Sequence, residues 1–366
     1  MIINNIHLKS FRNHADRSFT FAPGLNLICG ENGVGKTNIL EAIHLIATSK
    51  SHRGAREREM IEYNKPCSGV ALKYFAQERD QTLSVTLEHN AKRHFCHNNV
   101  AIKRTSDLLG LLNIVIFTPD DLQLIKGLPG LRRRFLDLTI CQAKPKYFSA
   151  LSSYNRVVYQ KNELLKREAD SDTLEIWNEQ LADYGATVAE YRRDFLRYLA
   201  AITADKFSEV VNHKLSLRYI NNYTDDAKIN NPTSIAKASL EPRDKESVKQ
   251  DILSAINRHA KKERRYKMSI IGVHRDDFSF AMDNKPAKAF CSQGQQRTIV
   301  ICTKLATVMW LDMCAKDKPI LLLDDVFSEL DDNRQHYILQ NIEGMQTIVT
   351  STTDNIVKEY AKCIYI

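Results

Sequence analysis

The most constraining feature of this 366-residue chain is the stretch GLNLICGENGVGKTNILEAI, residues 24–43. An apolar run ends in glycine, a glycine-rich loop follows, and apolar residues then recur at helical spacing. The loop reads G-x-x-x-x-G-K-T between a strand and a helix, which is the context that a phosphate-binding loop requires. Its glycines permit a tight turn, and its consecutive amides together with the helix N-terminus create a positive potential for an anion.

This loop predicts a nucleotide site. Lys36 is expected to reach the β- and γ-phosphates, and Thr37 to ligate Mg²⁺. The alternative is a chance glycine-rich turn, which the flanking strand and helix disfavour. The residues expected to cradle the phosphates are Gly30, Glu31, Asn32, Gly33, Val34, Gly35, Lys36, Thr37 and Asn38.

A second stretch, ILLLDDVFSELDD (320–332), begins as a buried parallel strand and ends in two carboxylates. Open α/β sheets bind ligands at the carboxyl ends of their strands. Asp324 is therefore the expected Mg²⁺ partner, and Asp325 is expected to orient or deprotonate an attacking water. The alternative is a solvated acidic turn that caps a helix, a role that fits Asp331 and Asp332 before the helix expected over 333–343.

The composition favours a folded, soluble protein, with 43% hydrophobic and 26% charged residues. No apolar run is long enough to span a bilayer, and the first residues lack the pattern of a secretory signal, so we expect a cytoplasmic protein without membrane association. The eight cysteines form no C-x-x-C pair, so we expect reduced thiols and no zinc site.

The net charge of +8 is unevenly distributed. Residues 122–167 contain ten Lys or Arg against two acids, and a second basic cluster covers 261–267. Concentrated positive charge suggests a polyanionic partner, DNA or RNA. The alternative is a solvated helix face. The candidates for DNA contact are Arg132, Arg133, Arg134, Lys144 and Lys146.

The β/α segments lie at both ends of the chain, and long helical patterns fill the middle, for example over 149–166 and 174–202. We therefore expect an α/β fold: one head assembled from residues 1–118 and 266–366, and a mostly helical inserted arm over 119–265. The polar stretch 221–246 is expected to be a loop or weakly ordered surface.

A third element, FCSQGQQRTIV, begins a helix shortly before the acidic strand. Phosphate loop, signature loop with helix, and acidic strand occur in the order that resembles the ATP-binding cassette ATPases. The resemblance implies that this signature contacts the γ-phosphate of ATP held by an opposite subunit, so that ATP joins two copies. The implied signature residues are Ser292, Gln293, Gly294, Gln295 and Gln296.

Other stretches narrow the match to the SMC-like, DNA-associated branch and within it to the bacterial RecF family. They are SFRNHADRSFTFAPGLNLICGENGVGKTNILEAI, FTPDDLQLIKGLPGLRRRFLD, GVHRDDFSF and LLLDDVFSELDDNR. The resemblance implies an Mg²⁺-dependent ATPase that dimerises on ATP, binds DNA at single-strand gaps, acts with RecO and RecR to help load RecA, and hydrolyses ATP to release DNA. It also implies that Arg12 lies by the nucleotide and that Ser328 and Asp331 belong to a D-loop.

The chain departs from the family pattern at three points. Asp325 stands where most of the superfamily has Glu, which suggests slow hydrolysis. Residues 350–353 (TSTT) stand where a phosphate-sensing His is usual, so a hydroxyl is the expected substitute. The Q-loop glutamine is not identifiable, since Gln77 and Gln81 lie in a predicted hairpin.

Two other functions remain as alternatives. A transporter nucleotide-binding subunit would normally carry the sensor histidine, and its arm would dock a membrane protein rather than carry a strongly basic surface. An SMC-like structural ATPase would need a long coiled coil, which the unsustained heptads of the insertion do not provide. The segment 274–277 (HRDD) is either close to the site or a structural turn.

Overall fold

The structure is a computed structural model that describes residues 1–224, 239–352 and 361–366. It contains two compact units: unit 1 comprises residues 1–121 and 307–366, and unit 2 comprises residues 122–306. Both ends of the chain contribute to unit 1. The first division lies close to the expected boundary at 118, whereas the second lies at residue 306 instead of 265. Most of the stretch expected to be a loop (225–238) and Thr353 of the proposed sensor segment lie outside the described residues.

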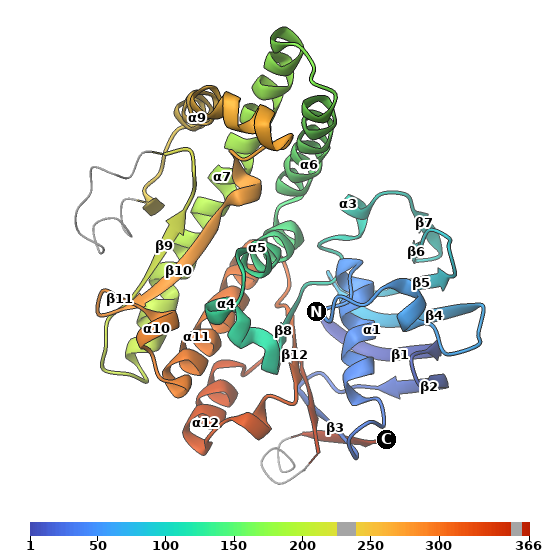
Figure 1. The fold of residues 1–366 in the computed structure, drawn as a ribbon. Helices are drawn as coiled ribbons and strands as arrows, with labels where there is room; N and C mark the ends of the chain where they lie inside the picture. The colour runs from blue at the N-terminus through green and yellow to red at the C-terminus, as the bar shows by residue number, and fades with distance from the viewer. Residues whose placement is uncertain (225–238, 353–360) are drawn as a thin grey trace. The chain divides into compact units, whose positions relative to one another are not determined.

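Unit 1 contains a parallel and an antiparallel sheet (Figure 1). The parallel sheet has the order β14-β3-β13-β12-β8, with β3 (Leu25–Cys29), β8 (Ile114–Phe117), β12 (Ile320–Asp324), β13 (Thr347–Ser351) and β14 (Lys362–Tyr365). The antiparallel sheet has the order β2-β1-β4-β5-β6-β7, with β1 (Ile2–Phe11), β2 (His14–Thr20), β4 (Cys67–Ala76), β5 (Arg79–Glu88), β6 (His94–His97) and β7 (Val100–Ile102). Gln77 lies in the turn between β4 and β5 and Gln81 lies in β5, as expected for a hairpin.

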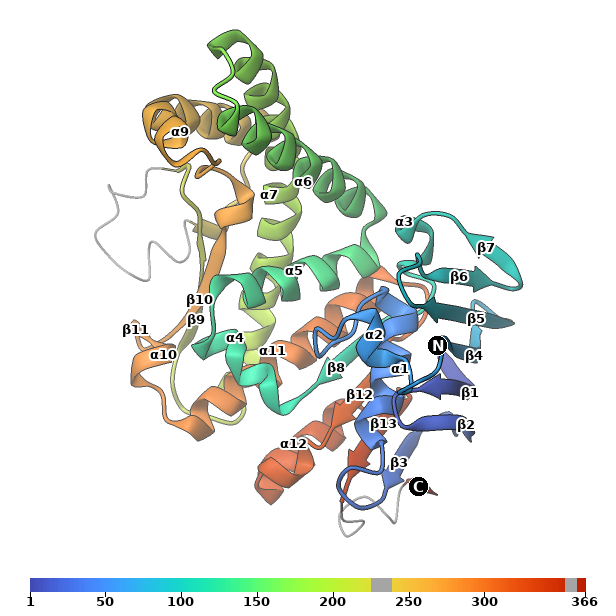
Figure 2. The same ribbon diagram turned by 45° about the vertical axis from the view of Figure 1, so that its right-hand side comes forward.

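Helix α1 (Lys36–Thr48) forms the core between these sheets, because it contacts β1, β4 and β5 of one and β8, β12 and β13 of the other. Because α1 is covered on both sides, its residues 39–47 are apolar except for Glu41 and His44, and these apolar residues are fully buried. The other helical segments in the described part of unit 1 are α2 (Glu57–Met60), α3 (Thr105–Leu108), η1 (Pro119–Leu122, ending at the unit boundary), η4 (Phe327–Glu329), α12 (Asp332–Asn341) and the end of α11 (Gln293–Cys314) from residue 307. Figure 2 shows β8, β12, β13 and β3 following one another across the parallel sheet.

Unit 2 combines helices with a three-stranded antiparallel sheet of order β11-β10-β9. Strand β10 pairs with β9, and α10 packs against β10, which places residues 266–306 in this unit instead of in the head. Its elements are α4 (Gln123–Lys126), α5 (Pro129–Ala143), α6 (Pro145–Lys166), α7 (Ser171–Ser208), β9 (Leu215–Ile220), α9 (Lys245–Tyr266), η3 (Val273–Arg275), β10 (Asp277–Met282), β11 (Lys285–Pro286), α10 (Ala287–Phe290) and most of α11 (Gln293–Cys314).

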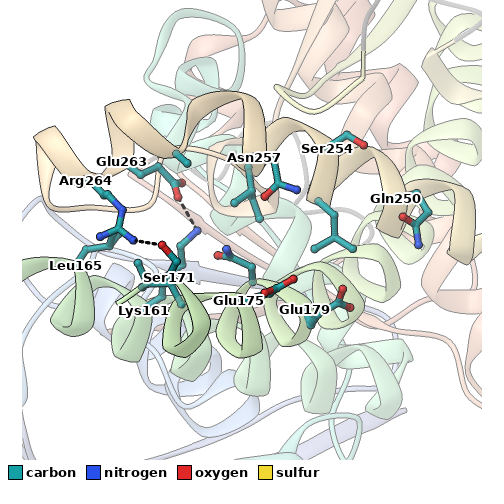
Figure 3. Close-up of a pocket in the computed structure, with 15 residues that line it drawn as sticks. Lys161, Leu165, Ser171, Glu175, Glu179, Gln250, Ser254, Asn257, Glu263 and Arg264 are labelled. Atoms are coloured by element: carbon teal, nitrogen blue, oxygen red, sulfur yellow. Dashed lines mark hydrogen bonds and ion pairs between the residues drawn. The ribbon is translucent and has the colours of Figure 1, made fainter. Parts of the chain in front are cut away.

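A polar cavity of about 490 Å³ lies among α6, α7 and α9 in unit 2. At one end of it, Lys161 Nζ lies 2.6 Å from Glu263 Oε2, and Arg264 donates a hydrogen bond to Ser171 (Figure 3). Glu263 also accepts a hydrogen bond from the backbone N–H of Ile270, so this ion pair joins α6 and α9 to the segment that leads into β10. Lys161 and Arg264 belong to the two basic segments for which a polyanionic partner is predicted, and here both are held in contacts within unit 2. None of the residues predicted to bind nucleotide, and none of the five named DNA candidates, lines this cavity.

None of the eight cysteines, all of which lie in the described part of the chain, forms a disulfide bond. None of the helices in the described part of the chain combines the length and apolar character needed to cross a bilayer.

Candidate nucleotide-binding site

The phosphate loop lies at the carboxyl end of β3, as predicted. Gly33 and Gly35 have φ angles of 86° and 111°, and this left-handed region is accessible to glycine without the penalty that a Cβ atom imposes. Gly35 is the N-cap of α1, so the helix N-terminus directly follows the loop. Loop amides and helix dipole are therefore both available to an anion at this position.

Lys36 folds back over the loop. Its Nζ donates hydrogen bonds to the carbonyl oxygens of Gly30 at 2.7 Å and Glu31 at 2.8 Å, and the residue is only 7% exposed. The ammonium group is thus held at the loop, where bound phosphate oxygens could replace these carbonyl acceptors.

The acidic strand meets the phosphate loop at one edge of the parallel sheet. Thr37 Oγ1 donates a hydrogen bond of 2.7 Å to Oδ1 of Asp324, the last residue of β12. Burial raises the pKa of Asp324, while its hydrogen bonds to Thr37 and Thr350 and the nearby charge of Arg53 act in the opposite direction. The residues predicted for the metal site are therefore in direct contact.

Asp325 has an unusual backbone conformation. Its φ angle is 50°, in the left-handed region that side-chain-bearing residues adopt infrequently, Asn and Asp more often than most. Its N–H donates to Thr350 Oγ1 at 3.0 Å, and its Oδ1 is buried without a hydrogen-bond partner among the described residues. An acceptor in this state is available to a polar group such as a water molecule.

Thr350 takes part in this network from the neighbouring strand β13. Its hydroxyl donates to Asp324 Oδ1 at 2.9 Å and accepts from the N–H of Asp325. A hydroxyl does occupy the end of β13, but it orders the two acidic residues. The sequence alone predicts only a phosphate-sensing hydroxyl at this position.

The donor set fits Mg²⁺, because the hydroxyl of Thr37 and the carboxylate of Asp324 supply the oxygen ligands that this ion prefers. In the described residues no group of three His, Cys, Asp or Glu could hold a metal. At phosphate sites Mg²⁺ is usually bound through few protein ligands together with phosphate oxygens.

Two residues after α1 were missed by sequence reasoning. His52 Nε2 lies 4.0 Å from Asp324 Oδ2, and Arg53 Nη1 donates to Asn38 Oδ1 at 3.4 Å. The only signal in the sequence was the polar, basic segment 49–56 that follows the helix.

Arg12 contacts α1 in this structure. Its guanidinium binds the carboxylate of Glu41 through two hydrogen bonds of 2.8 Å, and Glu41 is fully buried. Since Glu41 follows Thr37 by one helical turn, Arg12 joins the β1–β2 turn to the helix of the phosphate loop.

The signature segment lies at the start of α11 in unit 2. Ser292 Oγ accepts from the N–H of Gln295 at 3.2 Å, and Gln295 Oε1 accepts from the N–H of Ser292 at 2.9 Å. These reciprocal bonds form a capping box, which fixes the helix N-terminus. Ser292 and Gln293 are exposed, whereas Gln296 is buried and donates to the carbonyl oxygen of Cys291.

The D-loop candidates occupy structural positions after β12. Ser328 Oγ donates to the carbonyl oxygen of Asp325 at 2.8 Å, and Asp331 is the N-cap of α12 through the N–H of Arg334. Asp331 therefore caps a helix, which is the alternative role that the sequence predicts for it.

The basic candidates differ in their environments. Arg132 is 8% exposed and forms a bidentate ion pair with Asp277, and Arg133 donates to the carbonyl oxygen of Asp276. Burial lowers the pKa of Arg134. Lys144 is partly exposed and Lys146 is exposed, so these two are better placed to reach a phosphate backbone.

The segment 274–277 lies in a buried polar network of unit 2. Asp276 is fully buried, and its Oδ2 accepts from Arg192 at 3.1 Å and from Tyr219. Arg192 also binds the carbonyl oxygen of Val273 at 2.6 Å. These contacts support the structural alternative for this segment.

Comparison with known proteins agrees with this geometry. The family model described as "RecF/RecN/SMC N terminal domain" matches residues 2–366. A protein of Lachnoclostridium phytofermentans named "DNA replication and repair protein RecF" is 36% identical over 96% of this chain and 93% of its own length. The chain belongs to the RecF family. A RecF of Clostridium botulinum is 34% identical over 98% of this chain and 95% of its own length.

Solved RecF structures have the same fold. A recombination mediator protein RecF described as "RecF-ATP in RecFOR pathway" superposes with a TM-score of 0.90 and 31% identity, covering 100% of this chain and 95% of the other. Its counterpart with "ATPrS" gives a TM-score of 0.88 at the same identity and coverage. An Smc head bound to a domain of ScpA gives 0.55 at 16% identity, covering 100% of this chain and 94% of the other, which confirms the expected ATP-binding cassette head fold and no more.

Proposed function

We propose that this chain is an ATP-dependent, DNA-binding recombination mediator that acts in single-strand gap repair in the cytoplasm. The observation that carries the proposal is the contact between Thr37 of the phosphate loop and Asp324 of the acidic strand, at 2.7 Å. Support also comes from the RecF family and from relatives whose names include ATP and the RecFOR pathway. The proposed partners are RecR and RecO, with RecA loading as the outcome.

ATP binding is assigned to the phosphate loop and the residues around it. The loop amides and Lys36 would bind the phosphates, and Thr37 with Asp324 would hold Mg²⁺. When bound, Mg²⁺ neutralises charge on the phosphate oxygens. Asp325, held by Thr350, would accept a hydrogen bond from the attacking water through its buried, unpartnered Oδ1.

Slow turnover is part of the proposal. An aspartate side chain is one methylene shorter than the glutamate usual at this position, so its carboxylate is less able to approach the water. Because small displacements of a catalytic group reduce rates strongly, we expect hydrolysis to be slow and to act as a release step.

ATP-driven dimerisation is proposed from the signature segment. Ser292 and Gln293 are exposed at the N-terminus of α11, which a capping box holds in place. A helix N-terminus with an exposed hydroxyl suits the γ-phosphate of ATP bound to a second copy. The DNA would then be bound by the dimer and released after hydrolysis.

The test compares dimerisation and DNA binding, each with and without ATP, in the wild type and in Lys36→Met, Ser292→Arg and Asp325→Asn. Lys36→Met is expected to lose nucleotide binding. Ser292→Arg should bind ATP and remain monomeric, and Asp325→Asn should persist as an ATP-bound dimer. Thermal unfolding serves as the control that Ser292→Arg keeps its fold despite the altered cap. Normal dimerisation of Ser292→Arg would contradict the proposed interface.

A further inference from the structure

The β1–β2 turn binds the outer side of the phosphate loop. Asn13 Nδ2 donates to the carbonyl oxygens of Val34 at 2.9 Å and Gly33 at 3.4 Å. His14 Nε2 lies 3.1 Å from the carbonyl oxygen of Gly35. Three successive carbonyl groups of the loop are therefore bound by two adjacent side chains.

His14 must donate this hydrogen bond, because the carbonyl oxygen of Gly35 can only accept. His14 is 2% exposed, and burial lowers its pKa, which favours the neutral ring. Because Nε2 faces a carbonyl oxygen, the neutral ring carries its proton on Nε2. The same carbonyl oxygen accepts the N–H groups of Asn38 at 3.0 Å and Ile39 at 3.3 Å in the first turn of α1. The bond from His14 therefore ends on the carbonyl group with which the helix begins.

The turn itself is fixed to the helix that follows the loop. Arg12 has a φ angle of 54°, and its guanidinium forms the bidentate ion pair with Glu41 of α1. Asn13 Oδ1 also accepts from Asn38 Nδ2 at 2.9 Å. The turn that carries the two donors is thus held by two contacts to α1.

These contacts have a consequence for the loop amides. In a planar trans peptide, the C=O and N–H groups point in opposite directions. When the carbonyl groups of residues 33–35 are bound on one side, the N–H groups of residues 34–36 point to the other. Such a row of amides forms an anion-binding concavity.

We propose that Asn13 and His14 are positioning residues that pre-organise the phosphate loop by binding its carbonyl groups. This inference rests on the proposed ATP binding and adds to it the residues that set the direction of the loop amides. The two side chains also pack closely against Gly35, because a Cβ atom at this residue would lie 2.5 Å from Asn13 Oδ1 and 2.7 Å from His14 Nε2. Any side chain at Gly35 would displace both donors.

The test is titration with ATP in the presence of Mg²⁺, with wild type and paired variants. His14→Leu keeps an apolar side chain of similar size without the donor, whereas His14→Gln keeps an N–H donor. We expect His14→Leu to weaken ATP binding about five- to tenfold, the effect of one lost hydrogen bond, and His14→Gln to stay within about twofold. Asn13→Ala should weaken binding at least as much as His14→Leu, because it removes the bonds to both Gly33 and Val34. In steady-state kinetics, KM should rise more than kcat falls.

Matched controls come from the same hairpin. His7 and Asn5 lie on β1, where His7 pairs with Asp16 and Asn5 with Thr20, so neither touches the loop. His7→Leu and Asn5→Ala should bind ATP like the wild type. Because Asn13 is exposed, Asn13→Ala tests the proposal even if His14→Leu fails to fold.

Two results would overturn the proposal while leaving ATP binding intact. One is wild-type affinity in Asn13→Ala and in folded His14→Leu. The other is equal loss in His14→Gln and His14→Leu, which would assign the effect to packing instead of the hydrogen bond. A wild-type protein that binds no ATP would instead overturn the proposed function, and this inference with it.

Discussion

The hydroxyl of Thr37 donates a hydrogen bond of 2.7 Å to Asp324 Oδ1, although the two residues are 287 positions apart in the sequence. The same oxygen accepts a second bond from Thr350 Oγ1 at 2.9 Å. The loop after β3, the end of β12 and the end of β13 therefore share one hydrogen-bond network. These hydrogen bonds fix the positions of Asp324 and of the neighbouring Asp325 relative to the phosphate loop.

Thr350→Val is expected to slow ATP hydrolysis more than it weakens ATP binding. The variant keeps the shape of the side chain but leaves the N–H of Asp325 without its acceptor, at a residue whose φ angle is already unfavourable. We expect a loss of about tenfold or more in kcat and a change within about twofold in ATP affinity. Thr86→Val, at an exposed position on β5, is the control. Unchanged kcat in Thr350→Val would contradict a positioning role.

Arg12→Ala is expected to destabilise unit 1. Glu41 is fully buried, and removal of its guanidinium partner leaves a buried charge with much weaker compensation. We expect a loss of about 3 kcal/mol in the free energy of unfolding, measured by denaturant titration. The double variant Arg12→Met/Glu41→Gln removes the buried charge as well and should recover part of this loss.

The double variant also tests the expectation that Arg12 lies by the nucleotide. If Arg12 contacts ATP directly, the double variant would bind ATP weakly even where its stability is restored. If Arg12 acts only through Glu41 and the turn, affinity should recover together with stability.

Lys146 and Arg132 should differ in their effects on DNA binding. Lys146 is exposed, so Lys146→Ala is expected to weaken DNA binding and to reduce the slope of log affinity against log salt by about 1. Arg132 is held by Asp277, so Arg132→Ala should mainly lower stability, by about 3 kcal/mol. Lys73→Ala, which removes one exposed charge on β4, is the control. An unchanged salt slope in Lys146→Ala would contradict the phosphate contact.

The phosphate loop and the acidic strand could be predicted because their signals are local. A strand, glycines at fixed spacing and a helix are adjacent in the sequence, and the geometry of phosphate binding requires that order. Residues 320–325 are likewise a short apolar strand followed directly by its acids. In both cases the neighbouring residues in the sequence also determine the local structure.

The surroundings of the site could not be predicted in this way, because they depend on pairing across the chain. Asn13 and His14 contact the phosphate loop because the β1–β2 turn packs against loop residues that lie 20 or 21 positions later in the sequence. Arg132 was one of a run of basic residues, and only the fold shows that Asp277 lies against it. The division at residue 306 depends in the same way on the pairing of β9 with β10.

The last prediction concerns His274, whose Nδ1 accepts from the Tyr154 hydroxyl at 2.7 Å and whose Nε2 donates to the carbonyl oxygen of Ser269 at 3.1 Å. Burial lowers its pKa from 6.5 to about 4, so the neutral form is native and the unfolded chain binds the extra proton first. The contribution of His274 to the free energy of unfolding should therefore fall by about 1.4 kcal/mol for each pH unit as the pH decreases from 6.5 to 4.

Asp276 complicates a direct reading of this dependence, because burial raises its pKa to about 6 and gives a slope of opposite sign between pH 4 and 6. The difference between wild type and His274→Gln isolates the histidine, since glutamine can make both hydrogen bonds without titrating. We expect the unfolding free energy of the wild type, relative to the variant, to fall by about 3 kcal/mol from pH 6.5 to pH 4. His259→Gln, on α9 of the same unit, is the control. A pH-independent difference for His274→Gln would show that His274 does not titrate on unfolding in this range.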